Sequence, residues 1–462
     1  MRGGAEFRRR VIERFIARLA PWRKSLVALV RLAVPVIGAR LGIMTMGLTD
    51  VIVVGHYSAH ELAYQALGWA PTGVVITATV GLLSGIQVMT ARRIGKGRAG
   101  QAGAVLRRGL TYAFWIGAIS TALLVAAGPG LLRVLGLGDE LAEGAGRVLR
   151  VLALSLTPYA MSVALSSYLE ATNRPMPGLI AMWLANAVNL ALNLWLVRGG
   201  FGVPALGAVG ASIGTFGSRL ALLVALAVYI ARHPASKAHG VFDKPATDRP
   251  AAIEQRRIGY GAGASYFVEA AAFSGMNIVA GWLGPLPVAA WSVILNVSAV
   301  VFMLPLGLSA ATAVLVGQAY GARDPAGVVR AAWTGFGVST VMGLVVTVLI
   351  GVFPGVVARA YATDAALIAM TIPALAFTVL FFVPDGLQTV AAQALRARGD
   401  IVVPTVTHIV SYAAVMLPLG WWLAHRAHMG LFGIVWSVLL SSILASGLLI
   451  GRFVWLSRVD RS

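Results

Sequence analysis

Long apolar segments, separated by short polar connections, follow one another along almost the whole chain. Each is about 20 residues or longer, the length that an α-helix needs to cross the hydrocarbon core of a bilayer. The pattern predicts twelve membrane-spanning helices, at residues 29–55, 62–91, 106–127, 146–169, 177–197, 207–231, 258–284, 287–317, 328–353, 366–395, 401–424 and 430–457. We therefore expect an all-α polytopic membrane protein.

The basic residues gather in every second loop. The loops after the second and sixth predicted helices carry Arg92, Arg93, Lys96, Arg98, Arg107 and Arg108, and Arg232, Lys237, Lys244, Arg249, Arg256 and Arg257. The short loops after the first and seventh helices carry none. By the positive-inside rule, the even-numbered loops and both termini are expected on the cytoplasmic side. The net charge of +20 is then an orientation signal, and we expect no nucleic acid partner.

Composition supports lipid as the outer solvent. Hydrophobic residues make up 58% of the 462 residues, charged residues only 12%, and the mean hydropathy is +0.82. A soluble domain carries about a quarter charged residues, so this chain has too few to cover a globule of its size. The chain contains no cysteine, which excludes disulfides and thiolate metal sites.

The predicted helices form two sets of six, joined by the polar stretch HPASKAHGVFDKPATDRPAAIEQRR. The expected division is a basic cytoplasmic segment at 1–28, a first lobe at 29–232, a linker at 233–256, a second lobe at 257–457 and a tail at 458–462. The N-terminal segment fits either a basic helix on an anionic leaflet or a disordered tail.

The two sets resemble each other at an offset of 226 residues, which pairs Gly81 with Gly307 and Pro158 with Pro384. Because each set has an even number of helices, the halves share one orientation and form a parallel repeat. The sequence therefore predicts two pseudo-symmetric six-helix bundles around a central cleft.

Three carboxylates, Asp50, Glu269 and Asp385, lie well inside apolar segments. A charge at that depth costs about 2.5–3.5 kcal/mol, so such groups usually face the bundle interior. Burial favours the neutral form and a bound cation favours the charged form, so one carboxyl group can hold either a proton or a cationic ligand. The structural alternative is a carboxylate that only forms hydrogen bonds between helices.

The fifth predicted helix carries Asn186, Asn189 and Asn193 at helical spacing, and the sixth carries Thr215. Together with Asp50, such groups supply the hard oxygen atoms suited to a proton relay or a sodium ion. Amide packing between helices is the simpler alternative. Arg40 and Arg219 also lie inside apolar segments, and pairing with carboxylates and snorkelling are both open.

At this point the sequence resembles the multidrug and toxin extrusion (MATE) family, in its NorM-like branch. The resemblance runs from about residue 29 to 456 and is most specific in LAVPVIGARLGIMTMGLTDVIVVG, NLALNLWLVRGGFGVPALGAVGASIGT, SAVVFMLPLGLSAATAVLVGQAYGARD and PDGLQTVAAQALRARGD. It implies a secondary antiporter that takes in protons or sodium ions and exports organic, usually cationic, compounds by alternating access.

The resemblance also suggests roles for single residues. Pro35 and Asp50 match the proline and aspartate of the first helix, where the proline lets the helix bend. Asn189, Asn193 and Thr215 match the polar cluster around that aspartate, although some relatives carry Asp at the place of Asn193. A sodium ion is expected either in this cluster or at the second site described next.

The second half carries an acidic pair and the expected substrate cleft. Glu269 and Asp385 match the acidic pair of NorM-like members, and Phe302 matches an aromatic residue that faces the cation. A His-Gln pair is replaced by Trp291-Ser292, which changes that side of the cleft. We expect Phe302, Trp291 and Asn296 to line the cleft.

Two other functions compete with antiport. A lipid-linked oligosaccharide or lipid flippase of the same superfamily would need more cationic side chains in its cavity, and a polytopic membrane enzyme would need a catalytic constellation, which the sequence lacks. We expect no enzymatic activity, no cofactor besides the coupling ion, and a monomer that contacts small organic substrates and membrane lipids. Abundant Ala, Gly and Arg indicate a bacterial inner membrane as the location.

Overall fold

The protein folds into two bundles of helices, seen in a computed structural model that describes residues 2–134, 139–244 and 248–460. No β-strand occurs within these ranges. The first lobe consists of α1 (Arg2–Tyr57), α2 (Ala59–Gly95), η1 (Ala99–Gln101), α3 (Ala102–Val134), α4 (Asp139–Leu154), α5 (Leu156–Ala171), α6 (Met176–Leu196) and α7 (Gly207–Arg232). The short helix α8 (Pro234–Ala238) follows it in the linker.

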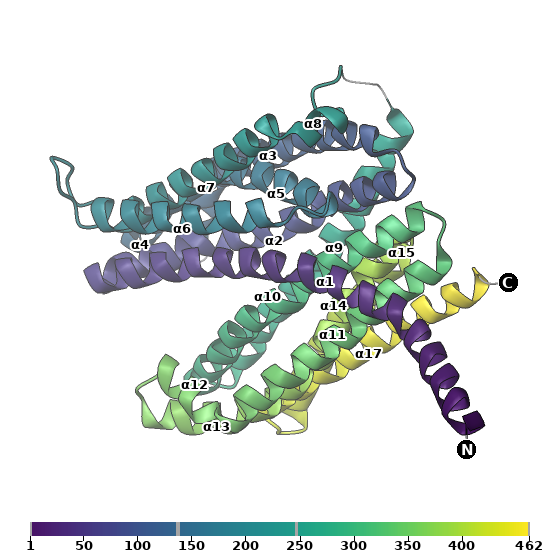
Figure 1. Cartoon of the computed structure of the whole chain (residues 1–462). Helices are drawn as coiled ribbons and strands as arrows, with labels where there is room; N and C mark the ends of the chain where they lie inside the picture. The colour runs from purple at the N-terminus through teal and green to yellow at the C-terminus, as the bar shows by residue number, and fades with distance from the viewer. Residues whose placement is uncertain (1, 135–138, 245–247, 461–462) are drawn as a thin grey trace.

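The second lobe repeats this arrangement with more interruptions. It consists of α9 (Arg249–Trp282), α10 (Pro285–Gly321), α11 (Pro325–Val352), α12 (Pro354–Tyr361), α13 (Ala365–Thr378), η2 (Val379–Phe381), α14 (Phe382–Ala397), α15 (Val402–His408), η3 (Ile409–Met416), α16 (Leu417–Trp421), η4 (Trp422–Arg426) and α17 (Leu431–Val459). Figure 1 shows the lobes meeting near both chain termini and diverging toward the opposite end.

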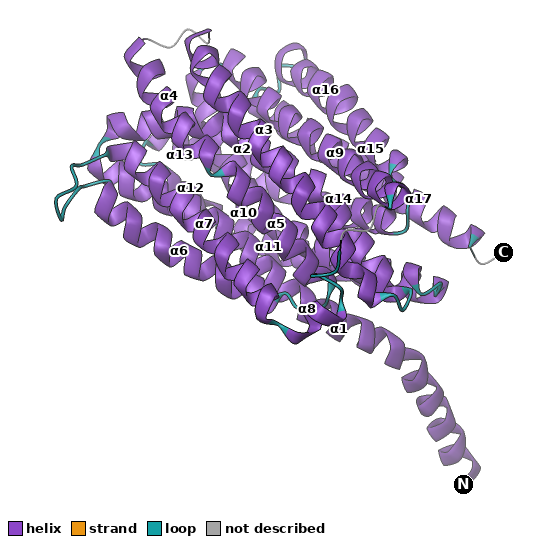
Figure 2. Ribbon diagram, turned by 90° about the horizontal axis from the view of Figure 1, so that it is seen from above, coloured by secondary structure: helices purple, strands orange, loops and turns teal. Residues whose placement is uncertain are grey.

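The twelve predicted spans correspond to the long helical segments. Within the described ranges, eleven helical segments are long and apolar enough to cross a membrane, and the 34-residue α9 supplies the twelfth. Their outer surfaces expose large apolar side chains such as Leu123 (61% exposed) and Val341 (62%), as a lipid-facing surface requires. Figure 2 shows the same helices from a perpendicular direction, with loops confined to their ends.

The basic N-terminal segment is not a separate element. α1 begins at Arg2 and continues without interruption to Tyr57, and its first part projects beyond the lobes in Figure 1. The expectation of a disordered tail is therefore wrong for the backbone. The side chains of Val11, Arg14 and Phe15, which would show whether this part is amphipathic, are not among those that the structure describes.

In both lobes the fourth span breaks just before a proline, and these two breaks are equivalent in the repeat. The predicted fourth span divides into α4 and α5 ahead of Pro158, and the tenth divides at η2 ahead of Pro384. Proline has no N–H and clashes with the carbonyl four residues earlier, so the helix opens at that point. The Thr121 hydroxyl donates to the carbonyl of Ala153 (2.7 Å), and in the second lobe Thr347 donates to that of Val379 (2.8 Å).

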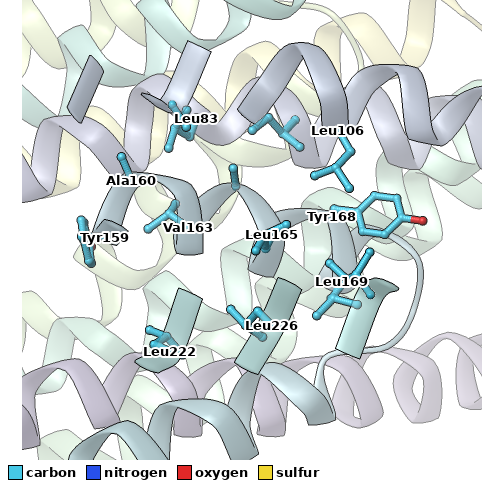
Figure 3. Close-up of a cluster of buried hydrophobic side chains, with 14 of the residues drawn as sticks. Leu83, Leu106, Tyr159, Ala160, Val163, Leu165, Tyr168, Leu169, Leu222 and Leu226 are labelled. Atoms are coloured by element: carbon cyan, nitrogen blue, oxygen red, sulfur yellow. The ribbon is translucent and has the colours of Figure 1, made fainter. Parts of the chain in front are cut away.

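Glycines bring the two lobes together along α2 and α9. A Cβ atom on Gly81 would lie 2.6 Å from the Cα of Gly263, and one on Gly85 would lie 2.1 Å from the carbonyl oxygen of Gln255. Glycines four residues apart on both helices thus allow the backbones into direct contact. One apolar cluster joins Leu29 and Leu32 of α1 to residues of the second lobe such as Leu308. Figure 3 shows part of the cluster centred in the first lobe, where α2, α3, α5 and α7 contribute Leu83, Leu106, Tyr159, Ala160, Val163, Leu165, Tyr168, Leu169, Leu222 and Leu226.

Candidate functional site

The first lobe encloses Asp50 in a ring of hydrogen-bond donors. Asn189 Nδ2 and Asn193 Nδ2 lie 3.0 Å and 2.6 Å from Asp50 Oδ1, and Thr215 Oγ1 lies 2.6 Å from Asp50 Oδ2. All four side chains are at most 2% exposed. The structure therefore brings together α1, α6 and α7 around one carboxyl group, with the four residues that the sequence predicts for this cluster.

The helical spacing of the asparagines explains this geometry. Asn189 and Asn193 are one turn apart on α6, so both amides point to the same carboxyl group, and they also contact each other (Asn193 Nδ2 to Asn189 Oδ1, 3.3 Å). Asn186 lies one turn earlier and instead donates to the carbonyls of Gly42 (3.0 Å) and Met182 (2.9 Å). The polar stripe thus holds α6 against α1 and orients the carboxyl group.

Both internal arginines of the first lobe have partners within it. Arg219 donates to Ser155 Oγ (2.7 Å), and its guanidinium lies 4.9 Å from the centre of the Tyr159 ring. Arg40 pairs with Glu170 (3.4 Å), whose other oxygen accepts a hydrogen bond from Gln87 Nε2 (2.6 Å). Of the two possibilities that the sequence leaves open, Arg40 pairs with a carboxylate.

The second lobe joins its two buried carboxylates through one amide. Gln388 Nε2 lies 3.2 Å from Glu269 Oε1 and 3.3 Å from Asp385 Oδ1. Gln388 is one turn after Asp385 on α14, while Glu269 comes from α9. The structure therefore brings the predicted acidic pair together and adds Gln388 between them.

A second layer of polar residues surrounds this pair. The Arg396 guanidinium is fully buried, donates to Ser265 Oγ (2.6 Å) and interacts electrostatically with Glu269. Gln393 Nε2 donates to the Tyr266 hydroxyl (2.9 Å), and His408 packs edge-on against Tyr412 with the ring centres 5.7 Å apart. The pair thus lies in a polar interior, with a cation nearby to balance its charge.

A cavity of about 280 Å³ separates the lobes at the depth of the acidic pair. Arg40 and Tyr159 line it from the first lobe, and Glu269, Asp385 and Phe302 line it from the second. Most of the remaining lining is apolar and includes Ile43, Met44, Phe273, Leu295 and Met303. Such a cavity offers an apolar surface and one anionic wall, which suits a flat organic cation.

Of the three residues predicted to line the cleft, one lines the cavity and two do not. Phe302 lines the cavity. Trp291 does not, because it is only 2% exposed and packs into the apolar core of the second lobe, so its expected place in the cleft is wrong. Asn296 is exposed, donates to the Ser292 carbonyl (2.9 Å) and lies outside the cavity lining. Pro35 lies inside α1, which continues through it as one helix.

The oxygen atoms at both sites suit a hard cation. Near Asp50 they come from a carboxylate, two amides and a hydroxyl, and Asn193 Oδ1 has no hydrogen-bond partner there. No cluster of three or more His, Cys, Asp or Glu side chains suited to a metal occurs in the described ranges. The arrangement can therefore carry a proton or a monovalent cation, and neither site resembles a transition-metal centre.

Several polar residues of these sites escape sequence reasoning. Glu170 lies close to a polar loop and reads as a helix-end carboxylate, although it is 6% exposed and paired with Arg40. Gln388 and Arg396 share one face of α14 with Asp385, at spacings of three and eleven residues. That periodicity is the signal that could have identified them.

Together the fold and the sites define a two-lobed membrane transporter with buried carboxylates on both sides of a central cavity. The sequence profile of the MatE family matches residues 35–195 and again residues 262–422, so it recognises each lobe separately, in agreement with the internal repeat. The chain belongs to this family, whose members are transporters and not enzymes.

Named relatives and solved structures agree. The chain is 56% identical over 441 residues to a "Probable multidrug resistance protein NorM" of Caulobacter vibrioides, covering 96% of this chain and 94% of that one. A protein of the same name from Bradyrhizobium diazoefficiens is 31% identical, with 94% of each chain covered.

Among solved structures, an outward-facing multidrug resistance MATE transporter has a TM-score of 0.87 at 21% identity, covering 95% of this chain and 97% of that chain. The eukaryotic MATE transporter AtDTX14 has a TM-score of 0.85 at 19% identity, covering 96% and 99%. At these identities the structural likeness concerns the fold.

Proposed function

We propose that the protein is a secondary antiporter that exports organic cations in exchange for protons or sodium ions. The observation that carries this proposal is the pairing of two different carboxylate sites with one cavity between the lobes. Glu269 and Asp385 line that cavity, whereas Asp50 is enclosed within the first lobe. One site can thus meet the substrate while the other meets the coupling ion.

The geometry around Asp50 gives coupling a physical basis. Three donors lie within 3.0 Å of its carboxylate oxygens, so the ionised form is well held in this arrangement. Protonation removes the charge and weakens the hydrogen bonds that the two asparagine amides donate, which favours a rearrangement of α1 against α6 and α7. Because a ligand shifts an equilibrium only by its differential affinity for the two states, this difference links proton binding to lobe conformation.

The cavity walls support a cationic substrate. The two carboxylates of the second lobe give the cavity negative charge, and the Phe302 ring can contact a cation through its face. Arg40 also lines the cavity, but Glu170 pairs with it. A flippase for an anionic pyrophosphate would need cations free to bind the substrate, so this pairing favours export of cations.

The membrane orientation completes the proposal. The ends of the helices near both termini carry most of the loop Lys and Arg residues, and by the positive-inside rule this supports a cytoplasmic position for that end in a bacterial inner membrane. The lobes meet at this end and diverge at the other. The conformation is then outward-facing.

Reconstituted protein tests the coupling ion directly. Proteoliposomes loaded with ethidium and given either a proton gradient or a sodium gradient, each alone, should transport the dye in one condition and not in the other. Liposomes without protein supply the control for leakage. Equal dye movement with no gradient would contradict antiport.

A further inference from the structure

A second large hollow shares no lining residue with the central cavity and lies beside the N-terminal part of α1. It has a volume of about 950 Å³. The hollow is lined by Ala20, Arg23, Lys24, Val27, Ala28, Arg31, Leu32, Thr172, Asn173, Arg174, Leu315 and Gln318, and we call it the basic groove. These residues come from α1, from the loop between α5 and α6, and from α10, so the groove touches both lobes.

The lining of the basic groove carries positive charge and no acidic residue. Four of its twelve lining residues are Arg or Lys and none is acidic. Arg23, Lys24 and Arg31 form no hydrogen bond or ion pair with any side chain that the structure describes, whereas Arg174 contacts only the His233 ring (Nδ1 at 2.7 Å). Three exposed cations on one helix face attract an anion and repel cations of the transported class.

The rest of the groove is mostly apolar. Val27, Ala28, Leu32 and Leu315 are among its lining residues, and Arg31 lies about two helical turns after the adjacent pair Arg23 and Lys24, on the same side of α1. An inorganic phosphate would leave this apolar part uncovered. A ligand with an anionic head and a hydrocarbon tail would cover both parts.

The position of the groove matches the membrane surface. On α1, exposed Val30 (42%) directly precedes Arg31, exposed Val34 (61%) follows it, and Trp22 (41% exposed) lies just before Arg23. Tryptophan is enriched where headgroups meet hydrocarbon. The groove therefore lies where a phospholipid presents its phosphate.

We propose that the basic groove binds one anionic phospholipid, with its phosphate at Arg23, Lys24 and Arg31 and an acyl chain along Val27, Leu32 and Leu315. The proposal rests on the membrane orientation given above, in which this end faces the anionic cytoplasmic leaflet. Gln318 lines the groove from the second lobe and donates to the carbonyl of Ala171 in the first (3.3 Å). A lipid held there contacts both lobes where they meet.

Native mass spectrometry of the purified full-length protein in detergent tests this directly. With dioleoylphosphatidylglycerol added, we expect one lipid retained per protein at concentrations where dioleoylphosphatidylcholine is not retained. The triple variant Arg23→Gln, Lys24→Gln, Arg31→Gln should weaken that retention at least about tenfold, since each basic residue near a membrane surface contributes measurably to anionic lipid binding.

A matched variant separates the groove from general surface charge. Lys96→Gln, Arg98→Gln, Arg232→Gln also removes three exposed positive charges from the same end of the molecule and should retain the lipid as the native protein does. Ala28→Trp keeps every charge but fills the groove, and it should weaken retention like the first triple variant. Gel filtration of each variant checks that it is folded.

Three results would overturn the proposal: equal retention of both lipids, equal loss in the two triple variants, or full displacement by soluble glycerol phosphate, which has no acyl chain. The measurement involves no gradient and no transported compound. Lipid retention without gradient-driven export would therefore leave the groove assignment intact and contradict only the antiport function.

Discussion

Residues 50 and 276 occupy equivalent places in the two lobes, yet one is an aspartate held by three donors and the other is a methionine packed in an apolar core. Asn193, which binds Asp50, corresponds to Leu419 at the same offset. In the opposite direction, Glu269 of the second lobe corresponds to Ile43 of the first. The lobes thus share one backbone plan and place their carboxylates at different points on it.

The buried cations follow the same contrast. In the first lobe Arg40 of α1 pairs with Glu170 of α5. The equivalent positions in the second lobe are Tyr266 and Arg396, so the positive charge moves from the first helix of the lobe to the fourth. The two lobes therefore share the arrangement of their helices, while the positions of their buried charged residues differ. This difference is consistent with the proposed antiport, in which one lobe responds to the coupling ion and the other to the substrate.

The largest expected effect comes from neutralising Asp50. Asp50→Asn mimics the protonated form permanently, so coupled export should fall by at least about a hundredfold, equivalent to about 2.7 kcal/mol, while folding and some substrate binding persist. Dye efflux from energised vesicles measures this. Asp139→Asn, at an exposed carboxylate of α4, is the matched control and should export normally.

Glu269→Gln should act differently from Asp50→Asn. It removes one charge from the cavity wall, so it should weaken the apparent affinity for the exported cation or the dependence on the coupling cation and leave the pump active. Export at nearly the native rate in Asp50→Asn, together with loss of export in Glu269→Gln, would contradict this assignment. The coupling site would then lie in the second lobe.

The largest effect on stability is expected in the first lobe. Glu170→Gln leaves the Arg40 guanidinium buried without a counter-charge, which should lower the free energy of unfolding by about 3–5 kcal/mol. The double variant with Arg40→Gln should lose less than the two single variants summed. Thermal unfolding in detergent measures both.

In the second lobe, Tyr266→Phe removes only the Gln393 hydrogen bond and should cost about 1 kcal/mol. Equal losses of stability in Glu170→Gln and Tyr266→Phe would contradict the proposed difference between the buried charges of the two lobes.

A moderate effect is expected where the lobes touch. Gly85→Ala would place a methyl group 2.1 Å from the Gln255 carbonyl oxygen, so α2 and α9 must separate, at a cost of about 1–3 kcal/mol in stability. Gly130→Ala in α3 meets nothing within 4 Å and should be neutral or stabilising by up to about 1 kcal/mol. Melting temperatures of the two variants in the same detergent decide the matter, and a drop in both would show that the lobe contact is not the cause.

The sequence was sufficient for features that depend on one helix at a time. The twelve spans follow from apolar length, and the alignment of Asn189 with Asn193 follows from the helical period. Their meeting with Asp50 on another helix was implied only by the family resemblance, and partners between helices that the resemblance does not cover were out of reach. Nothing local marks Glu170 as the partner of Arg40, because that pairing depends on how α1 packs against α5. Trp291 was misplaced for the same reason, since its position in α10 does not reveal which face points inward. The contact of α2 with α9 also explains Gly259 and Gly263, whose spacing alone favours no particular partner.

The smallest effect tests the feature that the lobes share. Thr121→Val and Thr347→Val each remove the hydroxyl that binds a carbonyl next to a proline break, at Ala153 and Val379 respectively. Each should lower the free energy of unfolding by about 1 kcal/mol, since the carbonyl then stays buried without its donor. Because the two breaks are equivalent, the losses should be alike, and the double variant should show their sum, as distant sites do.

Denaturant titration of the three variants beside the native protein gives these values. Thr111→Val, which removes a hydroxyl that binds only the Arg107 carbonyl within its own helix, is the control and should change stability little. If the two losses differ widely, then the backbone plan is not equivalent in the two lobes, and the asymmetry extends from the charged groups to the broken helices themselves.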